Sequence, residues 1–215
     1  ISDSDLSRIM CAIDELSAEV VDGTAAPIAS DEDVHTAMER LLMDKLGDVG
    51  GALRAGRSRN DQVATDFRLY LRDAARAIAH ATMDLIEALN AQATQHISTV
   101  SPGFTHLQHA QPVSFGHELA KHSHALLRDV DRLANWDDRT ARSPLGAGAL
   151  AGSSLGLDPQ LVAAELGFTS ALDNSIDAVS DRDFVAEFCF VGAMMAGNVS
   201  RVLDTAPQGV RVVDA

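Results

Sequence analysis

The sequence predicts an all-α protein built as a bundle of long helices. Aromatic residues make up only 4% of the 215 residues and alanine is abundant, which favours closely packed helices over a β-sandwich. From about 62 to 97 the apolar residues recur with a helical period, and neither glycine nor proline interrupts them. Such a helix is roughly 50 Å long and usually belongs to a bundle or to the core of an oligomer. No segment reads as a convincing strand.

Shorter helices are predicted before this long one. The apolar stripe from Leu6 to Leu16 predicts a helix that Gly23 closes. Ser30 is expected to cap the next helix, because acidic residues follow it where they suit the helix dipole. That second helix should stop at Gly47.

Three more helices are expected after the long one. Pro112 is a good first-turn residue and is expected to begin a second long helix. Asp158 and Pro159 read as the cap and first residue of a short helix that ends at Gly167. A last long helix is predicted over about 182–203.

This pattern divides the chain into three parts. Residues 1–61 form an N-terminal helical region, 62–203 form the central long-helix bundle, and 204–215 form a C-terminal tail that need not be contiguous with what precedes it. The apolar stripe on the long helix is more than one chain of this size would easily cover, so we expect it to lie at the centre of an assembly.

Composition excludes several classes of function. The chain has 17 Lys and Arg against 31 Asp and Glu, a formal net charge of −14, and such a surface repels nucleic acid and anionic membranes. No apolar run is long enough for a transmembrane helix. Cys11 and Cys189 lie in apolar helical patterns, so we expect buried thiols in a protein of the reducing cytoplasm.

A polar, arginine-rich segment precedes the long helix. Residues 54–62 read Arg-Ala-Gly-Arg-Ser-Arg-Asn-Asp-Gln. Free N–H groups at a helix N-terminus, together with guanidinium groups, suit a carboxylate or a phosphate. A polar helix cap with a surface arginine–aspartate pair is an equally good interpretation of the same residues.

A second candidate segment runs from Pro102 to Pro112 and contains His106 beside a threonine and two glutamines. A histidine in a loop that feeds a helix suits general acid–base catalysis, and Gln108 and Gln111 could hold the ring or the substrate. The alternative is a solvated loop histidine. We interpret the three later histidines of this region as structural or surface residues: His117, His122 and His124.

Two further segments carry a weaker signal. The glycine-rich stretch from Gly146 to Ser154 lacks the Gly-Lys-Ser/Thr ending of a phosphate-binding loop. Close helix packing, or approach of the backbone to a small ligand, accounts for it better. Around Asn174 and Ser175 ordinary helix capping accounts for the sequence, and a site role stays open.

Taken together, these segments resemble signature blocks of the argininosuccinate lyase family, in the fumarase/aspartase superfamily. The blocks are Gly-Arg-Ser-Arg-Asn-Asp-Gln at 56–62 and Thr-His-Leu-Gln at 105–108, followed by Ala-Gln-Pro at 110–112. Residues 32–35, 46–51, 144–158 and 174–188 resemble other family segments in the same order. The resemblance covers roughly residues 5–203, and the two blocks together are specific.

The resemblance implies a fold, a reaction and a set of site residues. It implies a bundle of the fumarase/aspartase type at the core of a homotetramer with shared active sites. It also implies β-elimination of argininosuccinate to arginine and fumarate in arginine biosynthesis, without a metal or an organic cofactor. His106 is the implied proton-transfer residue, and the implied substrate contacts or supports are Asn60, Thr105, Ser58, Arg59, Gln108 and Gln111. Arg57 and Arg59 would make the pocket locally positive.

One family feature is absent from these 215 residues. The family's third signature, Gly-Ser-Ser followed by Met-Pro-x-Lys-x-Asn-Pro, holds a catalytic serine and has no counterpart here. We therefore expect the sequence to join pieces of a longer protein or to belong to a truncated one. Two alternatives to the main function stay open: a non-catalytic structural relative on the same scaffold, and a sister lyase that yields fumarate from another substrate.

Overall fold

The structure, a computed structural model, describes residues 1–205 and is mainly helical, as predicted. It divides the chain into two compact units. The first comprises Ile1–Ser58 with Ser153–Leu157, and the second comprises Arg59–Gly152 with the described residues from Asp158 onward. The predicted tail at 204–215 lies almost entirely outside the described residues. In the described part of the chain, no helix combines the length and apolarity of a membrane span.

The first unit is a small helical layer. It contains α1 (Asp3–Val21), α2 (Val34–Leu46) and a 3-10 segment, η1 (Gly47–Arg54). The chain reverses after α1 at Gly23 and leaves α2 at Gly47, both with positive φ, so the two predicted helix ends are confirmed. A small apolar core holds these elements together: Ile9, Ala12 and Leu46, with Ile13, Leu42, Val49 and Leu53 around them.

The expected cap of α2 was wrong by three residues. Asp33, not Ser30, accepts the backbone N–H of Thr36, at 2.7 Å. Asp31 instead holds the preceding loop, where it accepts two hydrogen bonds from the Arg40 guanidinium, at 2.9 and 2.8 Å, and one from the Ile28 N–H. The hydrogen bonds from Arg40 and Ile28 lower the pKa of the Asp31 carboxyl to about 2.

This pair predicts a pH-dependent stability of the first unit. Because the folded-state pKa of Asp31 is depressed, the stabilisation is complete above the unfolded value of about 4 and is lost as the pH falls toward 2. Asp31→Asn should therefore lower the urea midpoint at pH 7 but have less effect near pH 2. Urea unfolding of both proteins at several pH values checks this, and a difference that does not change with pH would contradict it.

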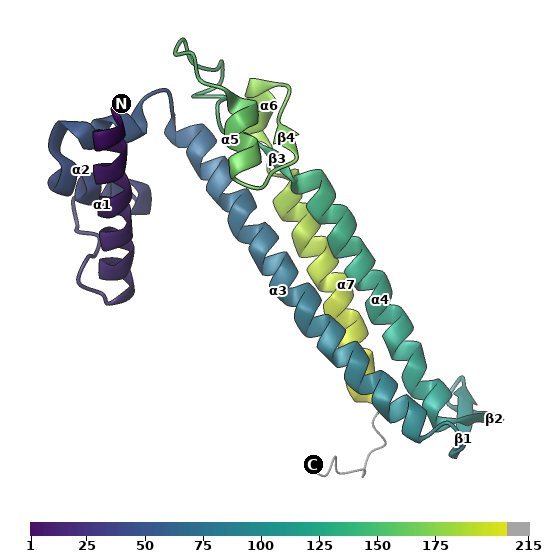
Figure 1. The fold of residues 1–215 in the computed structure, drawn as a ribbon. Helices are drawn as coiled ribbons and strands as arrows, with labels where there is room; N and C mark the ends of the chain where they lie inside the picture. The colour runs from purple at the N-terminus through teal and green to yellow at the C-terminus, as the bar shows by residue number, and fades with distance from the viewer. Residues whose placement is uncertain (206–215) are drawn as a thin grey trace. The chain divides into compact units, whose positions relative to one another are not determined.

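The second unit is an elongated bundle of three helices (Figure 1). These are α3 (Arg59–Gln95), α4 (Phe115–Thr140) and α7 (Asp183–Thr205), which confirms the predicted long helix and the last helix. Trp136 of α4 is wholly buried, and its indole N–H donates at 2.8 Å to the carbonyl of Phe184, in the first turn of α7. The main core of the bundle consists of Leu71, Ala75, Leu133, Trp136, Phe184, Val191 and Met195.

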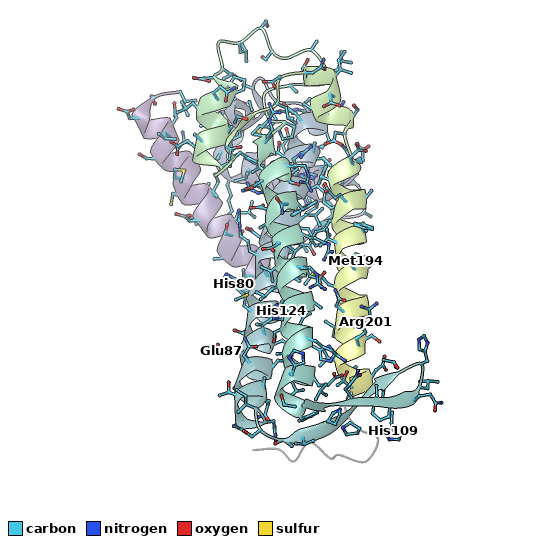
Figure 2. All side chains as sticks on the ribbon, turned by 90° about the vertical axis from the view of Figure 1, so that its right-hand side faces the viewer. His80, Glu87, His109, His124, Met194 and Arg201 are labelled. Carbon is cyan, nitrogen blue, oxygen red and sulfur yellow. The ribbon has the colours of Figure 1, made fainter. Side chains whose placement is uncertain are left out.

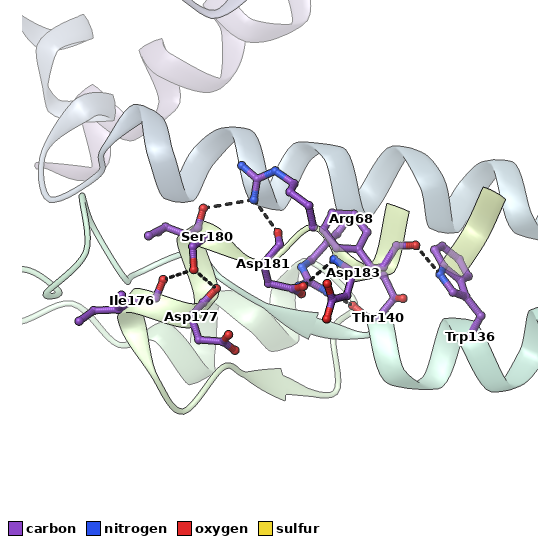
Figure 3. A network of polar contacts seen from close by, with 11 residues as sticks. Arg68, Trp136, Thr140, Ile176, Asp177, Ser180, Asp181 and Asp183 are labelled. Atoms are coloured by element: carbon purple, nitrogen blue, oxygen red, sulfur yellow. Dashed lines mark hydrogen bonds and ion pairs between the residues drawn. The ribbon is translucent and has the colours of Figure 1, made fainter. Parts of the chain in front are cut away.

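Two buried arginines of α3 are paired with partly buried carboxylates of neighbouring segments. The Arg68 guanidinium is ion-paired with Asp181 and lies 4.2 Å from the centre of the Phe184 ring (Figure 3). Burial lowers the pKa of Arg68. One turn further along α3, the Arg72 guanidinium donates to Asp137 at 2.7 Å. Removing either partner would leave an uncompensated charge in the bundle.

The segment after α3 overturns the expectation of no strand. Strands β1 (Val100–Thr105) and β2 (Gln108–Ser114) pair antiparallel at the end of the bundle. Pro112 therefore lies in a strand, and α4 begins at Phe115 instead, capped by the Ser114 hydroxyl, which accepts the His117 N–H at 3.1 Å. The hairpin places the second candidate segment on an arm rather than in an open loop.

At the other end of the bundle lie the shorter elements α5 (Pro159–Glu165) and α6 (Ser175–Ser180), and the two-residue strands β3 (Arg142–Ser143) and β4 (Ser170–Ala171), which pair in parallel (Figure 1). The predicted cap of α5 is confirmed, because the Asp158 carboxylate accepts the N–H groups of Gln160 and Leu161. Capping by Asn174 at α6 is confirmed in the same way.

One expectation about burial was wrong. Cys11 and Cys189 are both free and exposed, because they lie on the outer faces of α1 and α7. The apolar stripe of α3 is covered only in part by the chain itself. Leu71 is buried and Phe67 packs against the same core, whereas Ile78 stays exposed.

Candidate active site

His106 lies at the tip of the β1–β2 hairpin. Thr105 pairs with Gln108, so His106 and Leu107 alone form the two-residue turn. Their φ values are +50° and +61°, the left-handed conformation that two-residue hairpin turns of this kind require at both positions. Both side chains are exposed, and Leu107 retains 95% of its accessible surface. The turn therefore presents the imidazole at the end of an arm, away from the bundle core.

The other candidate residues of this segment lie on the same arm. Thr105 ends β1 and Gln108 begins β2, on either side of the turn, and Gln111 is further along β2. All three are exposed. The strand register shifts between Pro102 and Phe104, and at Gly103 the strands approach so closely that a Cβ would lie 2.6 Å from the Gln111 carbonyl oxygen. His106, Thr105, Gln108 and Gln111 thus all lie on one hairpin.

The first candidate segment lies where α3 begins. Ser58 directly precedes the helix and Arg59 is its first residue, with its guanidinium donating to the Gln62 amide oxygen at 3.3 Å. Arg54 is ion-paired with Glu39 at 3.2 Å inside the first unit. Asn60 donates from its side-chain amide to the Ala149 carbonyl, at 3.0 Å. Arg54 thus has its partner in the first unit, and Arg59 and Asn60 have theirs in the second.

Asp61, next in the chain, is a residue that sequence reasoning missed. Its carboxylate is wholly buried and accepts the N–H groups of Gly146 and Gly148, at 3.1 and 2.9 Å. The glycine-rich loop is thereby attached to the start of α3. The available signal was an acidic residue beside Asn60 in the first turn of a helix, which reads equally well as a surface charge favoured by the helix dipole.

The two groups of candidate residues lie at opposite ends of the bundle. Asn60 is in the first turn of α3, and the hairpin follows its last turn (Figure 1). A helix of 37 residues is about 55 Å long at 1.5 Å per residue. Asn60 and His106 of one chain therefore cannot contact the same small molecule.

The three later histidines of the region, His117, His122 and His124, lie on α4. His124 is exposed on the outside of the bundle, where Figure 2 also shows His80 of α3. His122 is buried, and its Nε2 is 2.8 Å from the Thr205 hydroxyl. Burial is the main cause that lowers the pKa of His122. Neither arrangement brings these rings to the hairpin turn, which agrees with a structural or surface role.

Comparison with known proteins identifies the class. The pattern of a protein family described as "Lyase" matches residues 1–204, and the chain belongs to this family. An argininosuccinate lyase of Frankia casuarinae is 61% identical over 198 residues, and one of Acidothermus cellulolyticus is 59% identical over 198 residues; each alignment covers 92% of this chain. The resemblance drawn from the two signature blocks is confirmed.

Solved structures give the same class. A variant of EDDS lyase with bound fumarate superposes with a TM-score of 0.83 at 30% identity, covering 95% of this chain and 40% of its own. EDDS lyase in complex with formate gives a TM-score of 0.79 at 33% identity, covering 94% and 38%. The chain spans about two-fifths of the curated relatives above, 43% and 40% of their lengths.

Proposed function

We propose that the protein to which this chain belongs cleaves argininosuccinate to arginine and fumarate, a step of arginine biosynthesis. The observation that carries the proposal is the 61% identity to an argininosuccinate lyase over 92% of the chain, a stretch long enough to include both signature blocks. The reaction is a β-elimination: a proton leaves the carbon next to a carboxylate, and the C–N bond breaks as the double bond forms.

The chemistry needs two kinds of group that the chain supplies. Negative charge builds on the carboxylate as the proton leaves, so donors must be fixed around it. Asn60, Arg59 and Ser58 lie at or beside the start of α3, where helix N–H groups add to their effect. Proton transfer belongs to His106, which either takes the proton from carbon or protonates the leaving guanidino nitrogen. Thr105 and Gln108 flank the turn that holds His106, Gln111 lies further along β2, and all three support the substrate.

We further propose that each active site is shared between copies in a homotetramer. A site that uses both Asn60 and His106 requires two copies, because within one chain they lie at opposite ends of α3. Leu107 supports this proposal. Its backbone is in the left-handed conformation and its side chain is 95% exposed, so contacts within its own chain stabilise it little, whereas packing on another copy would bury it. Apolar side chains on the outer faces of α3 and α7 support an assembly too: Tyr70, Ile78, Met83, Phe190, Met194 and Leu203.

We also place the protein in the cytoplasm, as the composition predicts. The thiols of Cys11 and Cys189 are free and exposed, and such thiols persist in a reducing compartment.

Fumarate release tests the activity. The purified protein is mixed with argininosuccinate, and the absorbance of fumarate is followed, with adenylosuccinate and EDDS tested in parallel reactions. Turnover of argininosuccinate above the others is expected. Preference for another fumarate-yielding substrate would favour a sister lyase. The similar structure of an EDDS lyase variant with bound fumarate is an example of that class. No turnover of any substrate would favour the non-catalytic relative.

Mixing two impaired variants tests the shared site. His106→Asn removes the proton-transfer group from the hairpin and Asn60→Leu removes the proposed carboxylate contact at the start of α3, so a mixed assembly holds some sites with both groups intact. Activity of the co-refolded mixture should exceed that of either variant alone. A mixture no more active than its components, or sedimentation of the wild-type protein as a monomer at micromolar concentration, would contradict the shared site.

A further inference from the structure

Asp61 is a buried carboxylate for which the proposed reaction has no direct use. It is in the first turn of α3 and has no exposed surface, 0% of the accessible value. Burying a carboxylate is costly unless it is hydrogen-bonded. Two backbone N–H groups, those of Gly146 and Gly148, donate to the same carboxylate oxygen, Oδ2. Hydrogen bonds to an ionised acceptor are about twice as strong as neutral ones.

The loop that donates these bonds is shaped to do so. Gly146 has a φ of +106° and Gly148 a φ of +61°. A Cβ on Gly146 would lie 2.7 Å from the Pro159 Cγ, and one on Gly148 would lie 2.6 Å from the Gly152 carbonyl oxygen. Any other residue at either position would strain the turn or displace a neighbour. The loop therefore has a backbone that favours glycine at both positions, with two amides directed at one oxygen.

Asn60 adds a third bond from the adjacent position. Its side-chain amide donates to the Ala149 carbonyl, at 3.0 Å. Asn60 and Asp61, consecutive residues of α3, thus bind three backbone groups of the stretch Gly146–Ala149. These are the N–H groups of Gly146 and Gly148 and the carbonyl of Ala149. The start of the helix and the loop form one hydrogen-bonded piece, although 85 and 87 residues separate Asp61 from its two donors.

We propose that Asp61 is a positioning residue, which holds the loop Gly146–Ala149 so that Asn60 is presented to the substrate carboxylate in one orientation. The inference rests on the proposed function, in which Asn60 contacts that carboxylate. If Asp61 releases Gly146 and Gly148, the Ala149 carbonyl moves and Asn60 loses the acceptor that orients its amide. Misplacing a substrate contact by about 1 Å can cost 10²-fold in rate.

Two variants and a matched control separate positioning from stability. Asp61→Asn keeps one acceptor oxygen and removes the charge, whereas Asp61→Ala removes both acceptors. Asp129→Asn makes the same change at another wholly buried aspartate, which is bonded to Asn198 and Arg132, each at 2.7 Å, in the bundle and away from both signature segments. All three variants should melt at lower temperature. Only the Asp61 variants should lower kcat/KM, by about 10²-fold for alanine and less for asparagine.

Hydrogen exchange without substrate gives a readout that does not depend on activity. The Gly146 and Gly148 amides should be protected in the wild-type protein and exchange at least about tenfold faster in Asp61→Ala, while amides in the bundle core change little. Should the alanine variant fail to fold, Asp61→Asn carries the same comparison.

The outcomes distinguish the two proposals. Unchanged exchange at Gly146 and Gly148 would overturn the role of Asp61 in holding the loop, whatever the enzyme does. Faster exchange with a loss of kcat/KM no larger than that of Asp129→Asn would overturn the positioning role and leave the proposed function standing. A wild-type protein that does not turn over argininosuccinate would instead overturn the proposed function.

Discussion

His106→Asn is expected to lower turnover of argininosuccinate by about 10²–10⁴-fold, the usual contribution of a general acid or base. Asparagine is polar but has no titratable group, so the substitution removes the proton-transfer group. It also tolerates the left-handed backbone of the turn, where the φ of His106 is +50°. The hairpin should therefore persist, and the loss should fall on kcat.

The control for this prediction is a histidine on the same unit with no place in the proposed site. His124 is exposed on α4, and His124→Asn should leave both turnover and melting temperature close to the wild-type values. Steady-state kinetics with fumarate detection, together with circular dichroism, measures both properties. Near-wild-type turnover of His106→Asn would remove this residue from the proton-transfer step.

The long helices were predictable because their signal is local and repeated many times. Over α3 the apolar period is unbroken, and the helix runs from Arg59 to Gln95 against a predicted 62–97. Caps with a single short polar side chain were predictable for the same reason, as Asp158 and Asn174 show. At α2 the sequence offers several acidic candidates in a row, and local preference alone did not select Asp33.

The hairpin was not predictable from local preference. Its turn residues are histidine and leucine, whereas two-residue turns with both φ values positive usually use asparagine and glycine. Its strands contain Pro102, Gly103 and Pro112, residues that are depleted in strands. The sequence of the hairpin therefore lacks the local pattern of a strand. The hairpin forms because its two strands pair with each other at the end of the bundle.

The candidate site was predictable only in part. The resemblance selected Asn60 and His106, but one sequence does not show that these residues lie at opposite ends of a helix about 55 Å long. Asp61 was missed because its partners are the backbone N–H groups of Gly146 and Gly148. Backbone donors leave no trace in residue types except the glycines themselves, and glycine is equally common at turns and at close contacts between helices.

Asn60→Leu is expected to reduce both kcat and the apparent affinity for argininosuccinate. If the Asn60 amide hydrogen-bonds the substrate carboxylate, leucine removes one of that carboxylate's donors, at a cost of about 1–3 kcal/mol. Charge grows on the carboxylate in the transition state, so the loss should appear in kcat as well as in KM. This corresponds to a fall in kcat/KM of about 5- to 150-fold, since each 1.4 kcal/mol is a factor of ten.

The structure gives Asn60 a structural role that competes with substrate binding. Asn60 lies inside α3 and donates to the Ala149 carbonyl, so the competing role is attachment of the loop rather than capping. Asn135→Leu is the matched control, because Asn135 also donates its side-chain amide to a backbone carbonyl, that of Asp131, at 2.7 Å. A lower melting temperature with unchanged kinetics in Asn60→Leu would make Asn60 a structural residue. Altered kinetics in Asn60→Leu, with wild-type kinetics in Asn135→Leu, would place it in contact with the substrate.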